Sequence, residues 1–378
     1  MRVVLTAGGT AGHINPALAV AQALSATGVE VLFAGTPDSL EERLVNEAGI
    51  AYAGFESRGL NRSKPWTIPQ TLIKLSRGRG AARSWLNSVK PDVVAAFGGY
   101  ACLPVSLAAG SLGIPLLVHE QNARPGLANR LLTKRADIIA LSDELAQSGF
   151  KTKARFEVTG NPLRAELFGV DPNTARQRLG LQQTGLLLLV FGGSLGAHHL
   201  NSAVLAIAKE LLDEFGDMEV IHLTGSQDYD WVKDTLTQAG ITQRWYPYAY
   251  SNQMGDAYAA ADLVLARAGA TSLAEITALG KASLLVPYPY AVADEQTANA
   301  QRLVDAGAAV IWPDCDLDAP GFTELLRSLI SDASRRASMS NQASSLGKPD
   351  ATAAIVALIL ELAGNQVVST GNRTVVSQ

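Results

Sequence analysis

The stretch MRVVLTAGGTAGHINP, residues 1–16, decides the first part of the fold. Its opening run of apolar residues is typical of a buried strand, and the glycines that follow predict a tight turn. Pro16 suits the first turn of a helix, so we expect Thr10, Ala11 and Gly12 to present backbone N–H groups at a helix start. A strand, a glycine turn and a helix in this order predict a βα unit of a parallel sheet.

Short apolar runs alternate with helical stretches along the rest of the chain. Such runs are typical of βαβ units, whose parallel sheets are buried on both faces. The sequence therefore predicts an α/β fold with two doubly wound, Rossmann-like domains. The expected strands are 2–6, 30–34, 93–97, 116–119, 138–141 and 156–159 in a first series, and 186–191, 219–223, 263–266, 283–286 and 309–312 in a second.

A chain of 378 residues is long enough for two domains. We place the first at 1–160 and the second at 161–344, because GNPLR at 160–164 has the glycine, asparagine and proline of a hinge. A C-terminal helix is expected at 345–362 and is predicted to pack back on the first domain. The polar residues 363–378 are expected to be disordered.

Bulk composition excludes several classes of protein. The formal charge of −4 predicts no nucleic-acid partner, because phosphate-backbone binding needs a basic face. Cys102 and Cys315 form no CxxC pair, which argues against a disulfide framework or a zinc site and favours a reducing cytoplasm. The first residues do not resemble a signal peptide. Glycines and prolines interrupt the uncharged stretch 93–118, so we expect it to be buried in protein rather than in lipid.

Paired glycines close three of the expected strands, at Gly8-Gly9, in FGGY at 97–100 and in FGGS at 191–194. Glycine adopts positive φ and lets a ligand approach the backbone, so such a joint before a helix suits a phosphate or a sugar. The carboxyl ends of parallel strands share one edge, and two facing edges predict a ligand cleft between the domains. A plain tight turn is the alternative for any single joint.

The segment GGTAGH at 8–13 differs from the GxGxxG dinucleotide fingerprint, and no acid closes the second strand. Both features argue against a nicotinamide cofactor. His13 is a candidate general base, because an imidazole with an ordinary pKa of about 6.5 can take a proton from a hydroxyl near neutral pH. A histidine that only caps or packs against the turn is the alternative.

The segment ARAGATSLAEI, residues 266–276, follows a strand and predicts a helix start with small residues. Its free N–H groups suit a phosphate, Arg267 would add a charge-assisted contact, and Glu275 could accept hydrogen bonds from a ribose diol. The alternative is that Ser272 to Glu275 only caps the helix.

Two further polar segments could contact sugar hydroxyls. Asn122 lies in HEQNARPG after a strand, and Gln296 lies in DEQTANA at a helix start. Solvated surface loops are the alternative for both. The DxD tripeptides at 228–230, 314–316 and 316–318 occur often by chance, and no other cluster has ligand spacing, so we predict no metal site.

The segment at 63–90 concentrates cations and large apolar side chains. A basic amphipathic helix with tryptophans favours an anionic membrane surface, where each Lys or Arg contributes about 1 kcal/mol. An ordinary helix, with its leucines toward the core and its cations in water, is the alternative. The residues predicted to contact the membrane are Trp66, Lys74, Leu75, Arg77, Arg79, Arg83 and Trp85.

Seven motifs stand together in an order similar to that of the MurG family of bacterial peptidoglycan N-acetylglucosaminyltransferases. They are GGTAGHINP, FGGY, HEQNARPG, GNPLR, FGGSLGA, ARAGATSLAEI and DEQTANA, within residues 1–362. The resemblance implies the GT-B arrangement of two Rossmann-like domains facing across a cleft. It implies metal-independent, inverting transfer of N-acetylglucosamine from UDP-GlcNAc to the 4-hydroxyl of the MurNAc sugar of lipid I, giving lipid II without a cofactor.

The resemblance also implies a place and a set of contacts. The enzyme would lie on the cytoplasmic face of the cell membrane as a peripheral protein, with cell-wall synthesis and division proteins as partners. His13 or a nearby carboxylate would be the base. The implied substrate contacts are Thr10, Ala11, Gly12, Asn122, Arg164, Ser194, Arg267, Ala270, Thr271, Ser272, Leu273, Ala274, Glu275 and Gln296.

This sequence departs from the family at three points. Ala11 replaces a glycine, so the turn requires negative φ at Ala11. Glu295 precedes Gln296 where the family has histidine or glutamine. YPYAYSNQM at 246–254 lacks the family's aspartates, and the uracil contact stays open among Ala249, Tyr250 and Ser251. Two other classes of protein stay open beside the transferase, a UDP-GlcNAc 2-epimerase and a non-catalytic UDP-sugar-binding protein.

Overall fold

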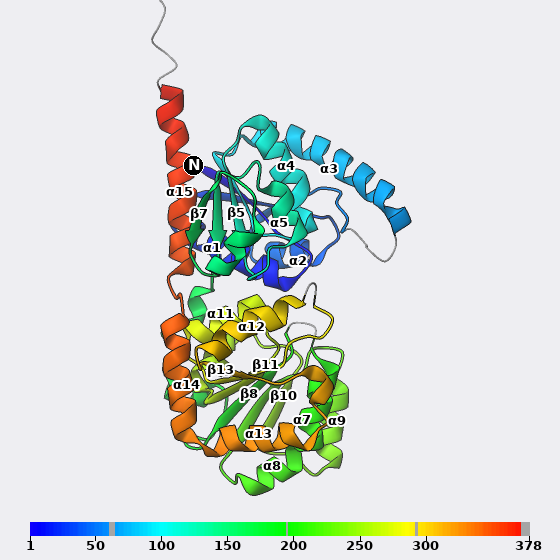
Figure 1. Cartoon of the computed structure of the whole chain (residues 1–378), viewed down its shortest axis with the longest axis vertical. Coiled ribbons are helices and arrows are strands. Elements are labelled where there is room, and N and C mark those ends of the chain that lie inside the picture. The colour runs from blue at the N-terminus through cyan, green and yellow to red at the C-terminus, as the bar shows by residue number, and fades with distance from the viewer. Residues whose placement is uncertain (60–64, 194–195, 292–293, 372–378) are drawn as a thin grey trace, which may run out of the picture. The chain divides into compact units, whose positions relative to one another are not determined.

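The computed structural model describes residues 1–59, 65–193, 196–291 and 294–371. The chain divides into two compact units, one formed by 1–164 with the segment from 350 onward and one by 165–349. Each unit holds one parallel sheet between helices, as the sequence predicts (Figure 1).

The first unit has a seven-stranded sheet with the order β3-β2-β1-β4-β5-β6-β7, and all pairs are parallel. Thr6 at the end of β1 pairs with Ala34 of β2 and Ala96 of β4, so these strands end at one edge. The strand order reverses between β1 and β4, the point where α/β sheets bind ligands. The strands are β1 (Arg2–Thr6), β2 (Glu30–Gly35), β3 (Ala51–Gly54), β4 (Val93–Ala96), β5 (Leu116–Glu120), β6 (Ile138–Leu141) and β7 (Arg155–Val158).

Helices cover both faces of this sheet (Figure 1). Successive side chains of a strand point to opposite faces, so Val3 and Leu5 pack with α1 and α15, whereas Val4 packs with α3 and α4. Burial on both faces explains why the strands are continuously apolar. The helices are α1 (Ala11–Ala26), α2 (Leu40–Glu47), α3 (Ile68–Val89), α4 (Leu103–Leu112), α5 (Leu127–Leu132) and α15 (Ala351–Gly371).

The second unit repeats this plan with six strands in the order β10-β9-β8-β11-β12-β13. Ala266 at the end of β11 pairs with Phe191 of β8 and Leu285 of β12, so their carboxyl ends also share an edge. The strands are β8 (Leu187–Phe191), β9 (Glu219–Leu223), β10 (Trp245–Tyr248), β11 (Leu263–Ala266), β12 (Ser283–Leu285) and β13 (Ala309–Ile311). The helices are α6 (Pro172–Arg178), α7 (His198–Ala206), α8 (Ala208–Glu214), α9 (Tyr229–Gln238), α10 (Met254–Ala260), α11 (Ala270–Ala278), α12 (Glu295–Asp305), α13 (Pro320–Ser331) and α14 (Ala333–Leu346).

The chain returns to the first unit through its last helix. The helix expected at 345–362 is interrupted in the structure, because α14 ends at Leu346 and α15 begins at Ala351. Gly347 lies so close to the end of α11 that an added Cβ would be 2.6 Å from the carbonyl oxygen of Thr277. In α15, Ile355 and Ile359 are fully buried against the first sheet. The helix continues to Gly371, beyond residue 363 where we expected disorder, and 372–378 lie outside the described residues.

Candidate active site

Two glycine turns lie against each other at the carboxyl edge of the first sheet. Gly8 and Gly9 follow β1, and Gly98 and Gly99 follow the neighbouring strand β4. Gly99 has φ +81°, and an added Cβ would lie 2.0 Å from the carbonyl oxygen of Gly8. Only glycine allows this backbone contact, because any Cβ would overlap the facing chain.

His13 lies in the first turn of α1, against the second glycine turn. A Cβ added to Gly98 would lie 2.9 Å from Cδ2 and 3.2 Å from Nε2 of the ring. Thr10 Oγ1 is 3.0 Å from Nδ1. Burial lowers the pKa of His13 to about 4, because the loss of water around the ring destabilises its protonated, charged form. The imidazole is therefore neutral at pH 7, the state in which it can take a proton.

Ala11 at the start of α1 has the backbone conformation that the sequence requires, but Pro16, which we expected in the first turn, lies further inside the helix. Ala11 is a helical residue, and it is not among the residues with positive φ. Thr10 is the N-cap residue, but its side chain makes no capping hydrogen bond, and the first turn of α1 carries no acid. Thr10 and Gly12 are exposed, and Ala11 is half-buried. This helix start is thus built from small side chains around accessible backbone.

Glu41 is a buried carboxylate beneath the first turn that sequence reasoning missed. Its side chain accepts hydrogen bonds from the backbone N–H of Thr36 at 3.2 Å and of Gly9 at 3.5 Å. An added Cβ at Gly8 would lie 2.6 Å from Oε1 of the same carboxylate. An acid in the first turn of the helix after β2 was the available signal. The Glu41 carboxylate is therefore used to stabilise the glycine turn after β1.

The polar loop after β5 is held largely by its own side chains. Glu120 is 1% exposed and accepts hydrogen bonds from the backbone N–H of Asn122 and Gly126, both at 3.0 Å, and from Asn129 Nδ2 at 2.8 Å. Burial raises the pKa of the Glu120 carboxyl, although these donors oppose the shift. Asn122 remains half-buried beside this carboxylate. The loop is therefore a rigid support rather than a set of mobile polar groups.

Gln121 and the buried His119 complete this support. Gln121 Nε2 donates to the carbonyl oxygen of Phe97 at 2.6 Å, which ties the loop to the second glycine turn. His119 Nε2 is 3.0 Å from the carbonyl oxygen of Gly160, and burial lowers the pKa of His119 to about 4.

The segment 266–276 of the second unit forms the expected helix start, α11. The N-cap of α11 is Gly269, which has no side chain to bond the first amides, so the capping device considered for Ser272 is not formed at this N-cap. Ala270, Thr271, Ser272 and Ala274 are half-buried, whereas Leu273 is buried. Helix starts of this kind present N–H groups and a positive dipole end to an anion.

Glu275 lies one turn into α11 and is 9% exposed. Its Oε2 accepts a hydrogen bond at 2.9 Å from the hydroxyl of Tyr258. Tyr258 is fully buried and packs edge-on against Phe191 at the end of β8, with ring centroids 6.0 Å apart. The carboxylate is thus positioned by the core.

Arg267 is more constrained than the sequence suggests. Its guanidinium is 8% exposed, donates to the carbonyl oxygens of Val286 and Pro287 at 3.2 Å each, and pairs with Asp314 Oδ1 at 2.5 Å. The guanidinium also lies 5.8 Å from the centre of the Tyr288 ring. Arg267 therefore joins three loops at this edge of the sheet.

The other predicted donor contacts differ in their placement. Gln296 Oε1 accepts from the backbone N–H of Tyr288 at 2.9 Å, so its orientation is fixed. Arg164 is half-buried at the boundary of the first unit. Ser194 lies outside the described residues. In the stretch expected to hold uracil, Tyr250 is 59% exposed and Ser251 Oγ accepts from the backbone N–H of Gln253.

Two of the DxD acids, Asp228 and Asp314, are occupied by contacts with other protein side chains. Asp228 pairs with His198 and accepts a hydrogen bond from Asn201 Nδ2 at 2.7 Å, whereas Asp314 pairs with Arg267 and His199. Within the described part of the chain, no group of three or more His, Cys, Asp or Glu side chains is arranged to hold a metal ion.

The described part of the basic segment comprises the short helical turn Pro65–Thr67 and the long helix α3, and its exposed apolar side chains lie on this turn and the first half of α3. Trp66, Leu72 and Ile73 are 71%, 57% and 52% exposed, and Lys74, Arg77 and Arg83 are exposed beside them. Among the described residues, no helix is long and apolar enough to span a membrane.

Three of the residues predicted to contact a membrane are less exposed than expected. Leu75 and Trp85 pack against the core of the first unit, and the Trp85 ring lies 5.3 Å from that of Phe55. Arg79 is half-buried. The cause is the helical period, which turns Leu75 and Trp85 toward the same inner stripe as Ala82.

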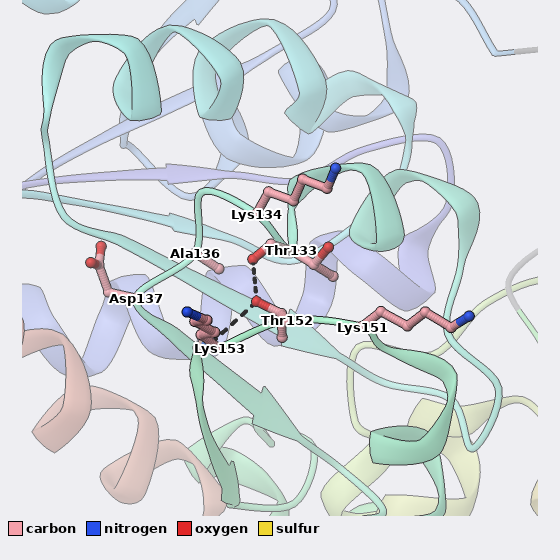
Figure 2. A pocket seen from close by; sticks show the side chains of 8 residues that line it. Thr133, Lys134, Ala136, Asp137, Lys151, Thr152 and Lys153 are labelled. Atoms are coloured by element: carbon pink, nitrogen blue, oxygen red, sulfur yellow. Dashed lines mark hydrogen bonds between the residues drawn. The ribbon is translucent and has the colours of Figure 1, made fainter.

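A basin at the opposite edge of the first sheet is lined by three lysines (Figure 2). It lies where β6 and β7 begin, away from the glycine turns. Thr152 Oγ1 donates to the carbonyl oxygen of Thr133 at 2.7 Å, and Asp137 accepts from the backbone N–H of Leu116. These contacts hold loops together, and we assign the basin no chemistry.

Comparison with known proteins decides the family. The glycosyltransferase family 28 N-terminal domain matches residues 3–141, and the glycosyltransferase family 28 C-terminal domain matches residues 187–355. This chain belongs to glycosyltransferase family 28. The first match covers the glycine turns of the first unit, and the second covers residues 266–276 of the second unit.

Two family 28 relatives carry one descriptive name, UDP-N-acetylglucosamine–N-acetylmuramyl-(pentapeptide) pyrophosphoryl-undecaprenol N-acetylglucosamine transferase. The protein from Halothermothrix orenii is 41% identical over 369 residues, covering 96% of this chain and 99% of its own. That from Moorella thermoacetica is 40% identical over 369 residues, with the same coverage. The predicted MurG resemblance is thus confirmed.

Solved structures share the fold of this chain. MurG of Acinetobacter baumannii superposes with a TM-score of 0.75 at 29% identity, covering 95% of this chain and 99% of that one. A structure described as a candidate UDP-N-acetylglucosamine 2-epimerase from Listeria monocytogenes reaches 0.68 at 16% identity, covering 95% of each chain. At that identity the second likeness concerns the fold alone.

Proposed function

We propose that this protein transfers N-acetylglucosamine from UDP-GlcNAc to the 4-hydroxyl of the MurNAc sugar of lipid I, forming lipid II. The observation that carries the proposal is that one chain contains two sites, one in each unit. One is a neutral histidine at a double glycine turn, and the other is an uncapped helix start with a buried carboxylate. The names of the family 28 relatives supply the substrates.

The second unit would hold the donor. The first amides of α11 would meet the diphosphate, Glu275 the ribose diol and Gln296 a hydroxyl of the sugar. Arg164 and Ser194 enter from the resemblance, as contacts to the nucleotide and its phosphates. Departure of UDP places charge on the diphosphate, and helix starts and N–H donors aimed at it would stabilise that charge.

The first unit would activate the acceptor. In the tautomer that donates from Nδ1 to Thr10 Oγ1, the Nε2 of His13 carries the lone pair that takes the hydroxyl proton. The oxygen then attacks the anomeric carbon from the face opposite UDP, which inverts that centre. We place the base at His13 because Glu41 is committed to backbone amides of the turn.

Attachment to a membrane surface is a separate part of the proposal. The exposed start of α3 combines apolar side chains with cations, which suits the cytoplasmic face of an anionic bilayer. We expect Leu72→Ser with Ile73→Ser to weaken binding to vesicles containing phosphatidylglycerol. Binding to phosphatidylcholine vesicles should be weak throughout. Loss of binding without a change in the free energy of unfolding supports the proposal, and unchanged binding contradicts it.

One assay tests the enzymatic proposal against the other two classes. The protein is incubated with labelled UDP-GlcNAc, with and without a lipid I analogue. UDP release that requires the acceptor supports the transferase. Conversion of the nucleotide sugar without acceptor would indicate an epimerase, and binding without turnover would indicate a UDP-sugar-binding protein.

A further inference from the structure

Asp314 joins two side chains that come from different elements of the second unit. It begins a short helical turn after β13, and its carboxylate is 12% exposed. Oδ1 lies 2.5 Å from a terminal nitrogen of Arg267, and Oδ2 lies 3.0 Å from Nδ1 of His199. Arg267 follows β11, and His199 is in the first turn of α7 after the glycines that close β8. One carboxylate thus connects three strand ends at the same edge.

The turn that carries Asp314 is itself fixed. Trp312 Nε1 donates to the carbonyl oxygen of Asp316 at 2.9 Å, and the Trp312 ring packs 6.2 Å from that of Phe322. Leu317, just after the turn, is 2% exposed. A carboxylate on such a turn can hold its partners in place, because the packing of the turn fixes the position of its backbone.

His199 has an acidic partner at each ring nitrogen. Nε2 lies 3.2 Å from Oδ2 of Asp318, so both nitrogens face carboxylates. Only the imidazolium donates two hydrogen bonds, and these acids raise the pKa of His199 accordingly. The charged groups facing the ring are Asp314 and Asp318, with Arg267 behind Asp314.

Arg267 transmits this placement to the donor contacts. It donates to the carbonyl oxygens of Val286 and Pro287, which lead into Tyr288. The backbone N–H of Tyr288 in turn donates to Gln296. A shift of Arg267 would therefore move the turn that orients Gln296.

We propose that Asp314 is a positioning residue for the sugar nucleotide, acting through Arg267 on the Gln296 turn and through His199 on the start of α7. The proposal rests on the proposed use of this edge for UDP-GlcNAc. It assigns to the DxD acid at 314 a role in orienting protein groups instead of a metal. Removing its charge loosens two loops that contact the donor and leaves the acceptor side unchanged.

The test compares Asp314→Asn with wild type in steady-state kinetics with both substrates. We expect KM for UDP-GlcNAc to rise about tenfold through the loss of the ion pair with Arg267, with kcat and KM for the acceptor changed less than about threefold. His199→Gln keeps one N–H donor toward Asp314 and should raise the donor KM less than His199→Leu does. Asp316→Asn, on the same turn, is the matched control, because that acid is exposed and pairs with neither Arg267 nor His199 in the described part of the chain.

The outcomes separate the two proposals. Wild type without acceptor-dependent turnover contradicts the proposed function. If the wild type turns over normally and the KM of Asp314→Asn for UDP-GlcNAc is within twofold of the wild-type value, the positioning role is contradicted. Equal losses for donor and acceptor, with a lowered free energy of unfolding, also contradict it, because they indicate general destabilisation.

Discussion

The protonation of His13 makes the proposed mechanism testable on the acid side of the pH–rate profile. An exposed histidine with a pKa of about 6.5 would lose its function as a base below neutrality. Burial lowers the pKa of His13 to about 4. The base should therefore stay unprotonated in mildly acidic solution.

The size of the effect follows from the two pKa values. At pH 5.5 a histidine of pKa 6.5 is about 9% neutral, whereas one of pKa 4 is about 97% neutral. Between pH 7.5 and 5.5 we expect kcat/KM for UDP-GlcNAc to change by less than about twofold, against roughly tenfold for an unperturbed base. This parameter is the suitable one because it reports the groups of the enzyme before the donor binds.

The assay is UDP release at a fixed concentration of acceptor analogue, run at half-unit steps of pH with stability checked at each. His13→Gln should lower turnover by roughly 100- to 10,000-fold while UDP-GlcNAc still binds, the range typical of a lost general base. An acid limb near pH 6.5 that disappears in His13→Gln would refute the lowered pKa. Near-wild-type turnover in the same variant would remove His13 from the base role.

Three further predictions concern the groups around the site. Gly98→Ala forces a non-glycine residue to φ +89° and puts a methyl group 2.9 Å from the facing imidazole, so circular dichroism should show an intact fold while turnover falls. Tyr258→Phe removes the hydroxyl that bonds Glu275, and isothermal titration should show UDP binding weakened by about 1 kcal/mol, roughly fivefold, whereas unchanged affinity would contradict the ribose role. Burial lowers the pKa values of His119 and His222 to about 4 and about 3, below the value of an unfolded histidine. The unfolded state therefore binds more protons, and the free energy of unfolding should fall as pH drops from 6.5 toward 4. Denaturant titrations of His119→Gln should show a shallower fall than those of the wild type.

The sequence predicted the interior of both sheets but missed one edge of each. Interior strands such as Val93–Ala96 are buried on both faces, so a continuous apolar run marks them. The two missed strands, Ala51–Gly54 and Trp245–Tyr248, lie at sheet edges, where half-exposed positions remove that signal. Pro247 within the second is tolerated because it lies in an edge strand.

Residues of the candidate site could be predicted where local sequence determines them. The glycines at 8 and 98 and the helix start at 270 follow from turn chemistry within a few residues. The role of Glu41 could not be predicted, because its partners Thr36 and Gly9 come together only when β1 and β2 pair.

The pairing of Asp314 with Arg267 lay beyond sequence reasoning for the same reason. The two residues are separated by 47 positions along the chain, and only the order β11-β12-β13 brings their strand ends to one edge. Sequence reasoning treated Arg267 as a free cation for phosphate, yet its charge is already balanced by the half-buried Asp314. In the proposed reaction, stabilisation of the leaving UDP would then depend more on the backbone amides of helix starts than on this side chain. Arg267→Lys should accordingly perturb donor binding through the lost contacts to Val286 and Pro287, because a lysine cannot reproduce the guanidinium fork.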